Sequence, residues 1–302
     1  MELVGKKELL GGGGLVAVSL ILVRYAELGL KSRPVRRRFE QVLVANMMAG
    51  LAKAGVEALV RSEQGRVFIE TDKEREAVRA ISRVFGVASL SVVMKTGSDM
   101  ESMGKVAAEL SRPILRERQS FAVKARRVGD HAYTSMDVGR EVGSAIFLAN
   151  EEKNVRVDLT SPDVVFYVEV RGKVAYVFST YIPGPGGLPL ATQGRALALV
   201  EEEKDALAAW LIMKRGCRVI AVARSENHGV EVLRSWDPEL KVVAPGEWSV
   251  LVKENRALAV VFGYTAENIE SIRDVALPVP AFYPLVGMRE DEIRERLEHI
   301  TD

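Results

Sequence analysis

Apolar and polar positions follow two different periods along this chain, and these periods predict three successive blocks of structure. The apolar run Leu15–Val23 predicts a buried strand, while Pro34 near its start and Gly55 after its end bracket a helix over residues 34–54. A hairpin with strands at residues 56–61 and 66–70 is then expected. A helix over residues 73–84 and a closing strand at residues 88–94 follow it. This order of elements is that of a ferredoxin-like domain.

The second block predicts a small α+β domain. A helix over residues 100–116 precedes a strand at Ser120–Val128 and a helix over residues 135–148, which Thr134 or Ser135 can cap. Three further strands are expected, at residues 155–160, 164–171 and 173–181. The Pro- and Gly-rich stretch 182–189 cannot continue a strand, so it marks a boundary.

The third block alternates strands with helices, which predicts a mostly parallel, Rossmann-like sheet that binds ligands at the carboxyl ends of its strands. The strands are expected at residues 196–200, 218–223, 241–243 and 257–262, and the helices at 203–215, 229–235, 266–272 and 289–299. The fold class is therefore α+β followed by α/β. We expect domains at residues 1–95, 96–183 and 184–302, the first including an extension, residues 1–14, without a clear pattern.

Composition narrows the classes of function. The 302 residues carry a net charge of +1, so a nucleic-acid partner requires a local basic face. The single cysteine, Cys217, excludes an internal disulfide and a cysteine-rich zinc site, and we interpret it as a small core residue of a cytoplasmic protein. The longest apolar stretch is too short to span a bilayer. Three scattered histidines indicate no catalytic or metal-binding group.

Two basic clusters interrupt the mixed charge, each opposed by one glutamate. The first contains Arg24, Lys31, Arg33, Arg36, Arg37 and Arg38, and the second contains Arg112, Arg116, Arg118, Lys124, Arg126 and Arg127. Taken alone, a charge run is more often a solvated face than a binding site. Aromatic residues near the clusters are few, Tyr25 and Tyr133, which favours recognition of duplex shape and backbone over stacked bases.

Several motifs, in the same order, resemble the tRNA 4-thiouridine synthetase (ThiI) family. In the first two blocks the resemblance rests on the opening VRYAELGLK (23–31), on the THUMP-like FAVKARRVG (121–129) with Thr134-Ser135, and on VDLTSPD (157–163) and VEVRG (168–172). Beyond them it rests on the linker IPGPGGLP (182–189) with Thr192-Gln-Gly194, and on the late segments AWLIMKRG (209–216) and PLVGMREDEI (284–293). It implies a ferredoxin-like domain, a THUMP RNA-binding domain and a PP-loop domain.

The resemblance also implies a partner, the acceptor region of tRNA, and a homodimer. The residues expected at the RNA are Arg24, Lys31, Arg36, Arg37, Arg38, Lys124, Arg126, Arg127, Thr134 and Arg171. Guanidinium groups suit this role because they bind phosphate in a bidentate manner.

One departure bears on chemistry. The family's pyrophosphate loop, Ser-Gly-Gly-x-Asp-Ser, falls on Glu201-Glu202-Glu203-Lys204-Asp205-Ala206. Two glycines let backbone N–H groups approach phosphate, and side chains in their place block that approach. Repulsion of about 1 to 4 kcal/mol for each nearby pair of like charges exceeds the roughly 0.3 to 1 kcal/mol that a helix dipole returns. We therefore expect a phosphate site that has lost its function.

Two other parts of the chain also differ from the family's pattern. The segment before Ala257 is shorter than in the family, and the chain ends soon after Ile293, where the family continues to a persulfide-carrying cysteine. The leading hypothesis is therefore a tRNA-binding protein without ATP-dependent adenylation, needing no cofactor, or one that supplies RNA binding to a separate catalytic partner.

Two alternatives stay open. In the first, the chain is an active 4-thiouridine synthetase, linked also to thiamine thiazole synthesis, with a rearranged site for ATP and magnesium. Leu199, Val200, Asp205 and Gly263 would then contact the nucleotide. The second is a scaffold that has lost RNA too, against which the retained basic motifs argue.

Overall fold

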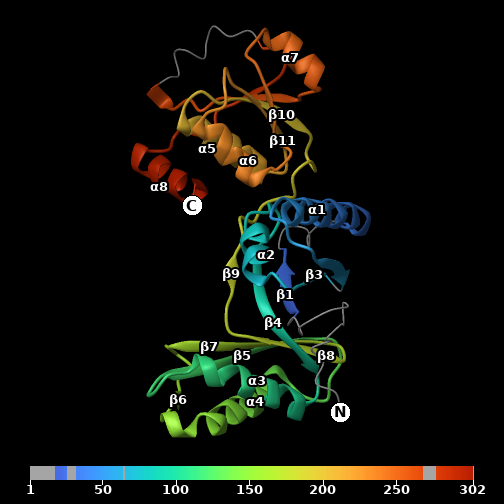
Figure 1. Ribbon diagram of the computed structural model, residues 1–302, viewed down its shortest axis with the longest axis vertical. Coiled ribbons are helices and arrows are strands. Elements are labelled where there is room, and N and C mark those ends of the chain that lie inside the picture. Colours follow the sequence, from blue (N-terminus) through green and yellow to red (C-terminus); the bar gives the residue numbers. More distant parts are fainter. Residues whose placement is uncertain (1–17, 26–31, 64, 268–276, 302) are drawn as a thin grey trace. The chain divides into compact units, whose positions relative to one another are not determined.

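The computed structural model describes residues 18–25, 32–63, 65–267 and 277–301 (Figure 1). These residues divide into two compact units. The first comprises the described parts of Met1–Val23, Phe68–Glu74 and Leu90–Ile182, and the second comprises those of Arg24–Val67, Arg75–Ser89 and Pro183–Asp302.

The first 97 residues contain the expected order of elements. It runs β1 (Ser19–Arg24), α1 (Arg33–Lys53), β2 (Leu59–Glu63), β3 (Arg66–Thr71), α2 (Glu74–Ile81) and β4 (Ser89–Gly97). The β-α-β-β-α-β order confirms the ferredoxin-like prediction. The described part of the first strand begins later than predicted, at Ser19, and the expected extension at residues 1–14 lies outside the described residues.

The first unit contains the second predicted domain. Its elements are α3 (Met100–Ile114), β5 (Ser120–Val128), α4 (Ser135–Ala149), β6 (Arg156–Val157), β7 (Val164–Arg171) and β8 (Val174–Phe178). Strands of this unit lie in the order β3-β1-β4-β8-β7-β5-β6 along the larger sheet. The helices cover one face of β5, β7 and β8, where Phe121, Phe166 and Val177 are fully buried with Val142 and Ile146 of α4.

Close packing of α3 on α4 depends on one glycine. A Cβ at Gly104 would lie 3.2 Å from the Cβ of Ala145, which is tighter than ordinary contact. The small residues therefore bring the two helices together over the sheet.

The second unit ends in the predicted parallel sheet. Its five strands are β10 (Arg195–Leu199), β11 (Arg218–Val222), β12 (Lys241–Val243), β13 (Ala259–Val261) and β14 (Ala281–Phe282), in the order β12-β11-β10-β13-β14 with every pair parallel. Helices α5 (Glu203–Lys214), α6 (His228–Trp236) and α8 (Glu290–Thr301) contribute to the core on one face, and α7 (Trp248–Asn255) to that on the other. Burial on both faces explains the continuous apolar runs of these strands.

An aromatic residue from the first predicted domain belongs to the core of this sheet domain. Phe85 packs with Trp210 and Trp236 at ring-centroid distances of 5.4 and 5.3 Å, and all three belong to the second unit. The linker is fixed to the end of α5, because the Leu188 N–H donates to the Lys214 carbonyl at 3.0 Å. Gly187 has φ +72° and leaves no room for a Cβ against Lys214, so glycine is required there.

The structure corrects several predicted elements. The strand expected at residues 155–160 contains only Arg156 and Val157, because the Asp158 carboxylate accepts the N–H groups of Thr160 and Ser161 and turns the chain. The linker does begin with a two-residue strand, β9 (Ile182–Pro183), which proline tolerates at a strand end. Helix α7 and strand β14 were not predicted.

The helix expected at residues 266–272 lies largely outside the described residues. Over the described ranges, no helix has both the length and the apolarity that crossing a bilayer requires.

Candidate functional site

The first candidate site is the turn between β10 and α5, where the sequence places Glu201, Glu202 and Glu203. The strand–turn–helix of a phosphate-binding loop is present, and Glu203 is the first residue of the helix. All three glutamates are exposed. Lys204 Nζ lies 2.9 Å from Glu202 Oε2, and Arg224 Nε lies 3.9 Å from Glu201 Oε1. Three exposed carboxylates against these two cations leave the turn with a net negative charge.

Asp205 occupies the backbone donors of this turn. Its Oδ2 accepts hydrogen bonds from the N–H groups of Glu201 and Glu202, at 3.0 and 2.9 Å. The side chain is 6% exposed, and burial raises the pKa of its carboxyl although the two N–H donors oppose that shift. The donors that would cradle a phosphate are thus already bound to a carboxylate of the chain itself.

The other residues expected at a nucleotide lie around Asp205. Gly263, which follows β13, is buried and leaves no space for a Cβ beside the Asp205 carboxylate. Val200 is fully buried, and its carbonyl accepts a hydrogen bond from the Asn227 side chain at 2.9 Å. Leu199 is half-buried against the core on the α7 side. The structure therefore brings the four predicted residues to the carboxyl ends of β10 and β13.

Sequence reasoning missed Asn227 in this site. Its Oδ1 accepts the Val230 N–H at 2.9 Å and caps α6, while its Nδ2 holds the carbonyl of Val200. An asparagine immediately before an apolar helix is a capping signal that could have found it.

A cavity opens beside the turn. It has a volume of about 290 Å³ and is lined by the first turns of α5 and α6 and by α8, including Glu203, His228, Gly229 and Arg294. This volume is at the lower limit of small-molecule sites, which run from about 300 to 1,000 Å³. Acidic and basic groups both line it, so it does not form an anion site by charge alone.

The second candidate site is the face of β5 that points away from α3 and α4. Phe121, Val123 and Ala125 lie in or against the core under those helices, so Lys124 and Arg126 alternate onto the opposite face, where both are exposed. Arg127 alternates back, is half-buried, and donates from Nη1 to the Gly129 carbonyl at 3.3 Å. The three cations therefore do not form one surface.

Arg171 lies at the end of the neighbouring strand and serves a buried ion pair. In the parallel register, Arg126 stands beside Glu169 and Val128 beside Arg171. Arg171 Nε contacts Glu169 Oε1 at 2.7 Å, and the two side chains are 8% and 5% exposed. With its guanidinium buried against a carboxylate, Arg171 supports the sheet beneath the basic face.

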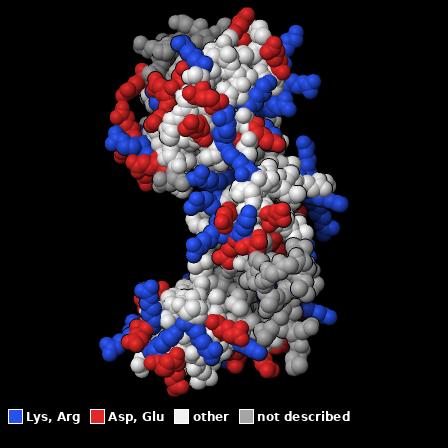
Figure 2. All heavy atoms as spheres, viewed as in Figure 1, with Lys and Arg blue, Asp and Glu red and all other residues white. Residues whose placement is uncertain are grey.

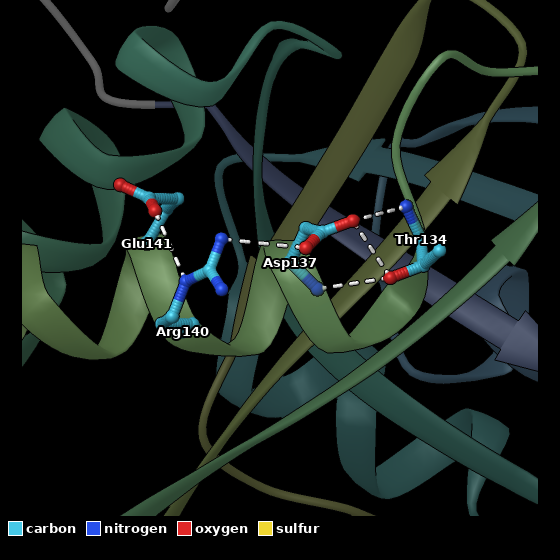
Figure 3. A network of polar contacts seen from close by, with 4 residues as sticks. All are labelled: Thr134, Asp137, Arg140 and Glu141. Carbon is cyan, nitrogen blue, oxygen red and sulfur yellow. Dashed lines mark hydrogen bonds and ion pairs between the residues drawn. The ribbon is translucent and has the colours of Figure 1, made fainter.

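Thr134 caps the helix that follows β5 (Figure 3). Its Oγ1 accepts the Asp137 N–H at 3.2 Å, and Asp137 Oδ2 accepts the N–H and hydroxyl of Thr134, each at 2.8 Å. Donation from Thr134 lowers the pKa of the Asp137 carboxyl. Arg140 lies between Asp137 and Glu141, at 3.4 and 3.3 Å. The exposed Thr134 hydroxyl is therefore engaged in capping α4.

The first basic cluster surrounds the start of α1. Arg37 and Arg38 are exposed, Arg36 is half-buried, and Arg24 is 8% exposed at the end of β1. The first turn of α1 contains no acidic residue, and Ser32 does not cap it with its side chain. Cations at a helix N-terminus oppose the helix dipole, so this arrangement suits an external anion. Lys31 lies outside the described residues.

Lysine and arginine do not form one continuous field on the visible face of the molecule. Figure 2 shows blue and red side chains interspersed there. Cys217 is half-buried and burial raises its thiol pKa, which fits an unreactive side chain. In the described ranges, the histidine, cysteine and acidic side chains form no group of three or more that could hold a metal.

Comparison with known proteins places these features in a family. Residues 20–91 match the ThiI ferredoxin-like domain, and residues 97–180 match the THUMP domain. A Methanosarcina acetivorans protein named "Probable tRNA sulfurtransferase" is 44% identical over 208 residues, which cover 68% of this chain and 50% of that protein. The chain thus matches about half the length of this relative.

Other relatives align with nearly the whole chain. The protein of the same name from Methanothermobacter thermautotrophicus is 31% identical over 336 aligned positions, covering 93% of this chain and 84% of that protein. These positions outnumber the 302 residues of this chain, so the relative contains residues that have no counterpart in it.

Two solved structures show the same fold. PH1313 from Pyrococcus horikoshii is 29% identical with a TM-score of 0.80, over 93% of this chain and 99% of that chain. A 4-thiouridine synthetase in complex with RNA and ATP is 24% identical with a TM-score of 0.75, over 94% and 85%. Given the near-complete alignment with relatives of that name and the two matched domains in order, the chain belongs to the tRNA sulfurtransferase (ThiI) family.

Proposed function

We propose that this protein binds the acceptor region of tRNA and does not adenylate it. One observation carries the loss of adenylation: the exposed Glu201, Glu202 and Glu203 surround the turn in place of the serine and two glycines of the family's loop, and the Asp205 carboxylate accepts the N–H groups of Glu201 and Glu202. A triphosphate entering there would have to displace a buried carboxylate and lie against like charges. Both effects disfavour binding.

The THUMP domain and the exposed cations of β5 and α1 support the RNA-binding part. Lys124 and Arg126 share one face, and the cations at the start of α1 lack an acidic neighbour in that turn. In this proposal the protein is cytoplasmic, uses no cofactor, and acts as a homodimer or with a separate catalytic partner.

Calorimetric titration tests the proposal. The protein is titrated with ATP and magnesium, with and without tRNA, and separately with tRNA alone. We expect heat from tRNA and none from ATP in either state. Micromolar ATP binding would contradict the loss of adenylation, and absence of tRNA binding would contradict the RNA-binding function.

A second function is favoured by the cavity of about 290 Å³ beside the turn and by the strand–turn–helix. In this alternative, the protein is an active 4-thiouridine synthetase with a link to thiamine thiazole synthesis. ATP with magnesium would bind near Leu199, Val200, Asp205 and Gly263. ATP-dependent appearance of 4-thiouridine in tRNA, measured by its absorbance, would establish it over the first proposal.

A further inference from the structure

The cavity beside the β10–α5 turn is framed by one face of each of three helices. Glu203 and Ala206 lie three positions apart on α5, and His228 and Val232 lie four positions apart on α6. Helix α8 contributes four residues at helical spacing, Arg294, Leu297, Glu298 and Thr301. The three helices belong to the same core, where α5 packs against both α6 and α8 (Figure 1). Regular elements therefore define the volume of about 290 Å³.

One part of the cavity wall is apolar. Ala206, Gly229 and Val232 are buried, and Leu297 is half-buried. A Cβ on Gly229 would lie 3.4 Å from the Cβ of Ala206, so these small residues let α5 and α6 begin close together. Neither residue carries a side chain long enough to fill the cavity, which leaves the apolar wall open to a ligand.

The other part of the wall is charged and contains both signs. Glu203 of α5 and Arg294 and Glu298 of α8 are exposed. Within the described part of the chain, none of these three has an ion-pair partner within 4.0 Å. Glu292 and Arg296 lie at the same four-residue spacing on α8 and do pair, at 2.8 Å. The charges of Arg294 and Glu298 therefore remain available to a ligand.

This combination of groups disfavours simpler ligands. Two carboxylates repel a phosphate or a triphosphate, and Arg294 repels a simple cation. Residues one turn apart on a helix have Cβ atoms about 5–6 Å apart, so Arg294 and Glu298 can hold two opposite charges on neighbouring atoms of one small molecule. The apolar wall beside them suits an apolar substituent on that molecule.

We propose that this cavity binds a free α-amino acid with an aliphatic side chain. The carboxylate of the amino acid contacts Arg294, and its ammonium group contacts Glu298 and Glu203. Its side chain lies against Val232 and Leu297. The site contains none of the cations of β5 and α1, so it adds a function that tRNA binding neither requires nor supplies.

Calorimetric titration of the full chain with a matched panel tests the class of ligand. L-leucine carries all three groups, whereas N-acetyl-L-leucine lacks the cation, L-leucinamide lacks the anion and glycine lacks the apolar side chain. We expect L-leucine to bind and each of the other three to bind at least tenfold more weakly. Each of them leaves a charged or an apolar part of the wall without its partner.

Two outcomes of this titration would overturn the proposal. One is the absence of binding at about 10 mM L-leucine, roughly ten times a millimolar dissociation constant. The other is an affinity for any of the three control ligands equal to that for L-leucine.

Two variants of α8 assign the charged contacts. Arg294→Gln should weaken L-leucine binding at least tenfold and reduce the preference for L-leucine over L-leucinamide, because the carboxylate loses its partner. Glu298→Gln should instead reduce the preference over N-acetyl-L-leucine. The matched control is Arg296→Gln, on the same helix but outside the cavity, which should leave the affinity unchanged. Circular dichroism checks that all three variants are folded.

The same measurements include the outcomes that assign the cavity differently. Unchanged L-leucine affinity in folded Arg294→Gln, or an equal loss in Arg296→Gln, would overturn the proposed contacts. Competition with ATP and magnesium separates this site from a nucleotide site. We expect no displacement of L-leucine, and displacement would assign the cavity to ATP.

Discussion

Gly263 and Asp205 are packed so closely that a Cβ on Gly263 would overlap the Asp205 carboxylate. Gly263 does not have a positive φ, so the requirement for glycine is steric and not conformational. Two segments almost sixty positions apart thus fix the carboxylate that accepts the N–H groups of the β10–α5 turn.

Substituting this glycine tests the steric requirement. Gly263→Ala should lower the free energy of unfolding by about 1 to 3 kcal/mol, because the added methyl group must move buried backbone. Urea unfolding followed by circular dichroism measures the change. The control is Gly50→Ala, where the new Cβ has ordinary contacts and glycine lies inside α1. The control should gain roughly 0.5 to 1 kcal/mol, and equal effects would refute the steric argument.

The buried Asp205 carboxyl should make stability depend on pH in a defined direction. Its pKa is raised in the folded protein by burial, so the folded state holds its proton over a range where the unfolded chain has lost it. Stability from this group is therefore greatest at low pH and falls as pH rises from the unfolded pKa, about 3.9, through the raised folded value.

The measurement is the difference in free energy of unfolding between the wild type and Asp205→Asn. The contributions of the other carboxyl groups are the same in both proteins and cancel in this difference. Relative to Asp205→Asn, the wild type should gain stability as pH falls from 7 into this range. A difference that does not change between pH 7 and 4 would show that Asp205 is not desolvated as the structure indicates.

Restoring the family's loop tests whether the turn alone blocks ATP. Glu201→Ser, Glu202→Gly and Glu203→Gly, combined with Ala206→Ser, remove the like charges and the side chains together. We expect ATP to raise the melting temperature of this variant and not that of the wild type. A ligand at 100 times its dissociation constant adds about 2.7 kcal/mol of stability, which a thermal scan detects. No shift in the variant would mean that other parts of the site are lost too.

The position of Lys124 and Arg126 on one face of β5 predicts the salt dependence of tRNA binding. Replacing both by alanine should weaken binding and reduce the slope of log affinity against log salt by roughly 0.9 for each phosphate that is no longer neutralised. Arg127→Ala, on the other face, should change the slope less. Filter binding at several salt concentrations separates the two, and an equal effect of Arg127→Ala would argue against a face-specific contact.

The family resemblance implies that Thr134 lies at the RNA, and its capping bonds suggest a different test. Thr134→Ala should lower the free energy of unfolding by about 1 kcal/mol through loss of the α4 cap, whereas Thr134→Ser should retain it. If capping is its role, tRNA affinity of the folded Thr134→Ala variant will match wild type. A selective loss of affinity would restore Thr134 to the RNA interface.

Sequence patterns predicted the strands and helices whose apolar residues recur with a clear period. The continuous apolar strands β10 and β11 and the alternation of β5 required no tertiary information. Helix α7 was missed because β-branched Val250 and Val252 disfavour a helix locally, and packing of Leu251 and Val252 in the core overrides that preference. Strand β14 is only two residues long, too short for a period.

The candidate sites were predictable in residue type but not in role. A run of cations in β5 revealed charge, but only alternation about a known core separates Lys124 and Arg126 from Arg127. The sequence does not distinguish Arg171 from the exposed cations, because its buried ion pair with Glu169 depends on the folded strand. The surviving aspartate of the loop was evident, but its bonds to Glu201 and Glu202 depend on side-chain geometry that no spacing encodes.

The packing of Phe85 against Trp210 and Trp236 makes the residues before the linker depend on the sheet domain for stability. A polypeptide ending before the linker would present a bare phenylalanine to water and lose the stabilisation of a large buried aromatic side chain, roughly 1.5 to 3 kcal/mol. The sheet domain is thus a structural partner of the residues that precede it. It can lose the chemistry of its loop and still be indispensable to the molecule that carries it.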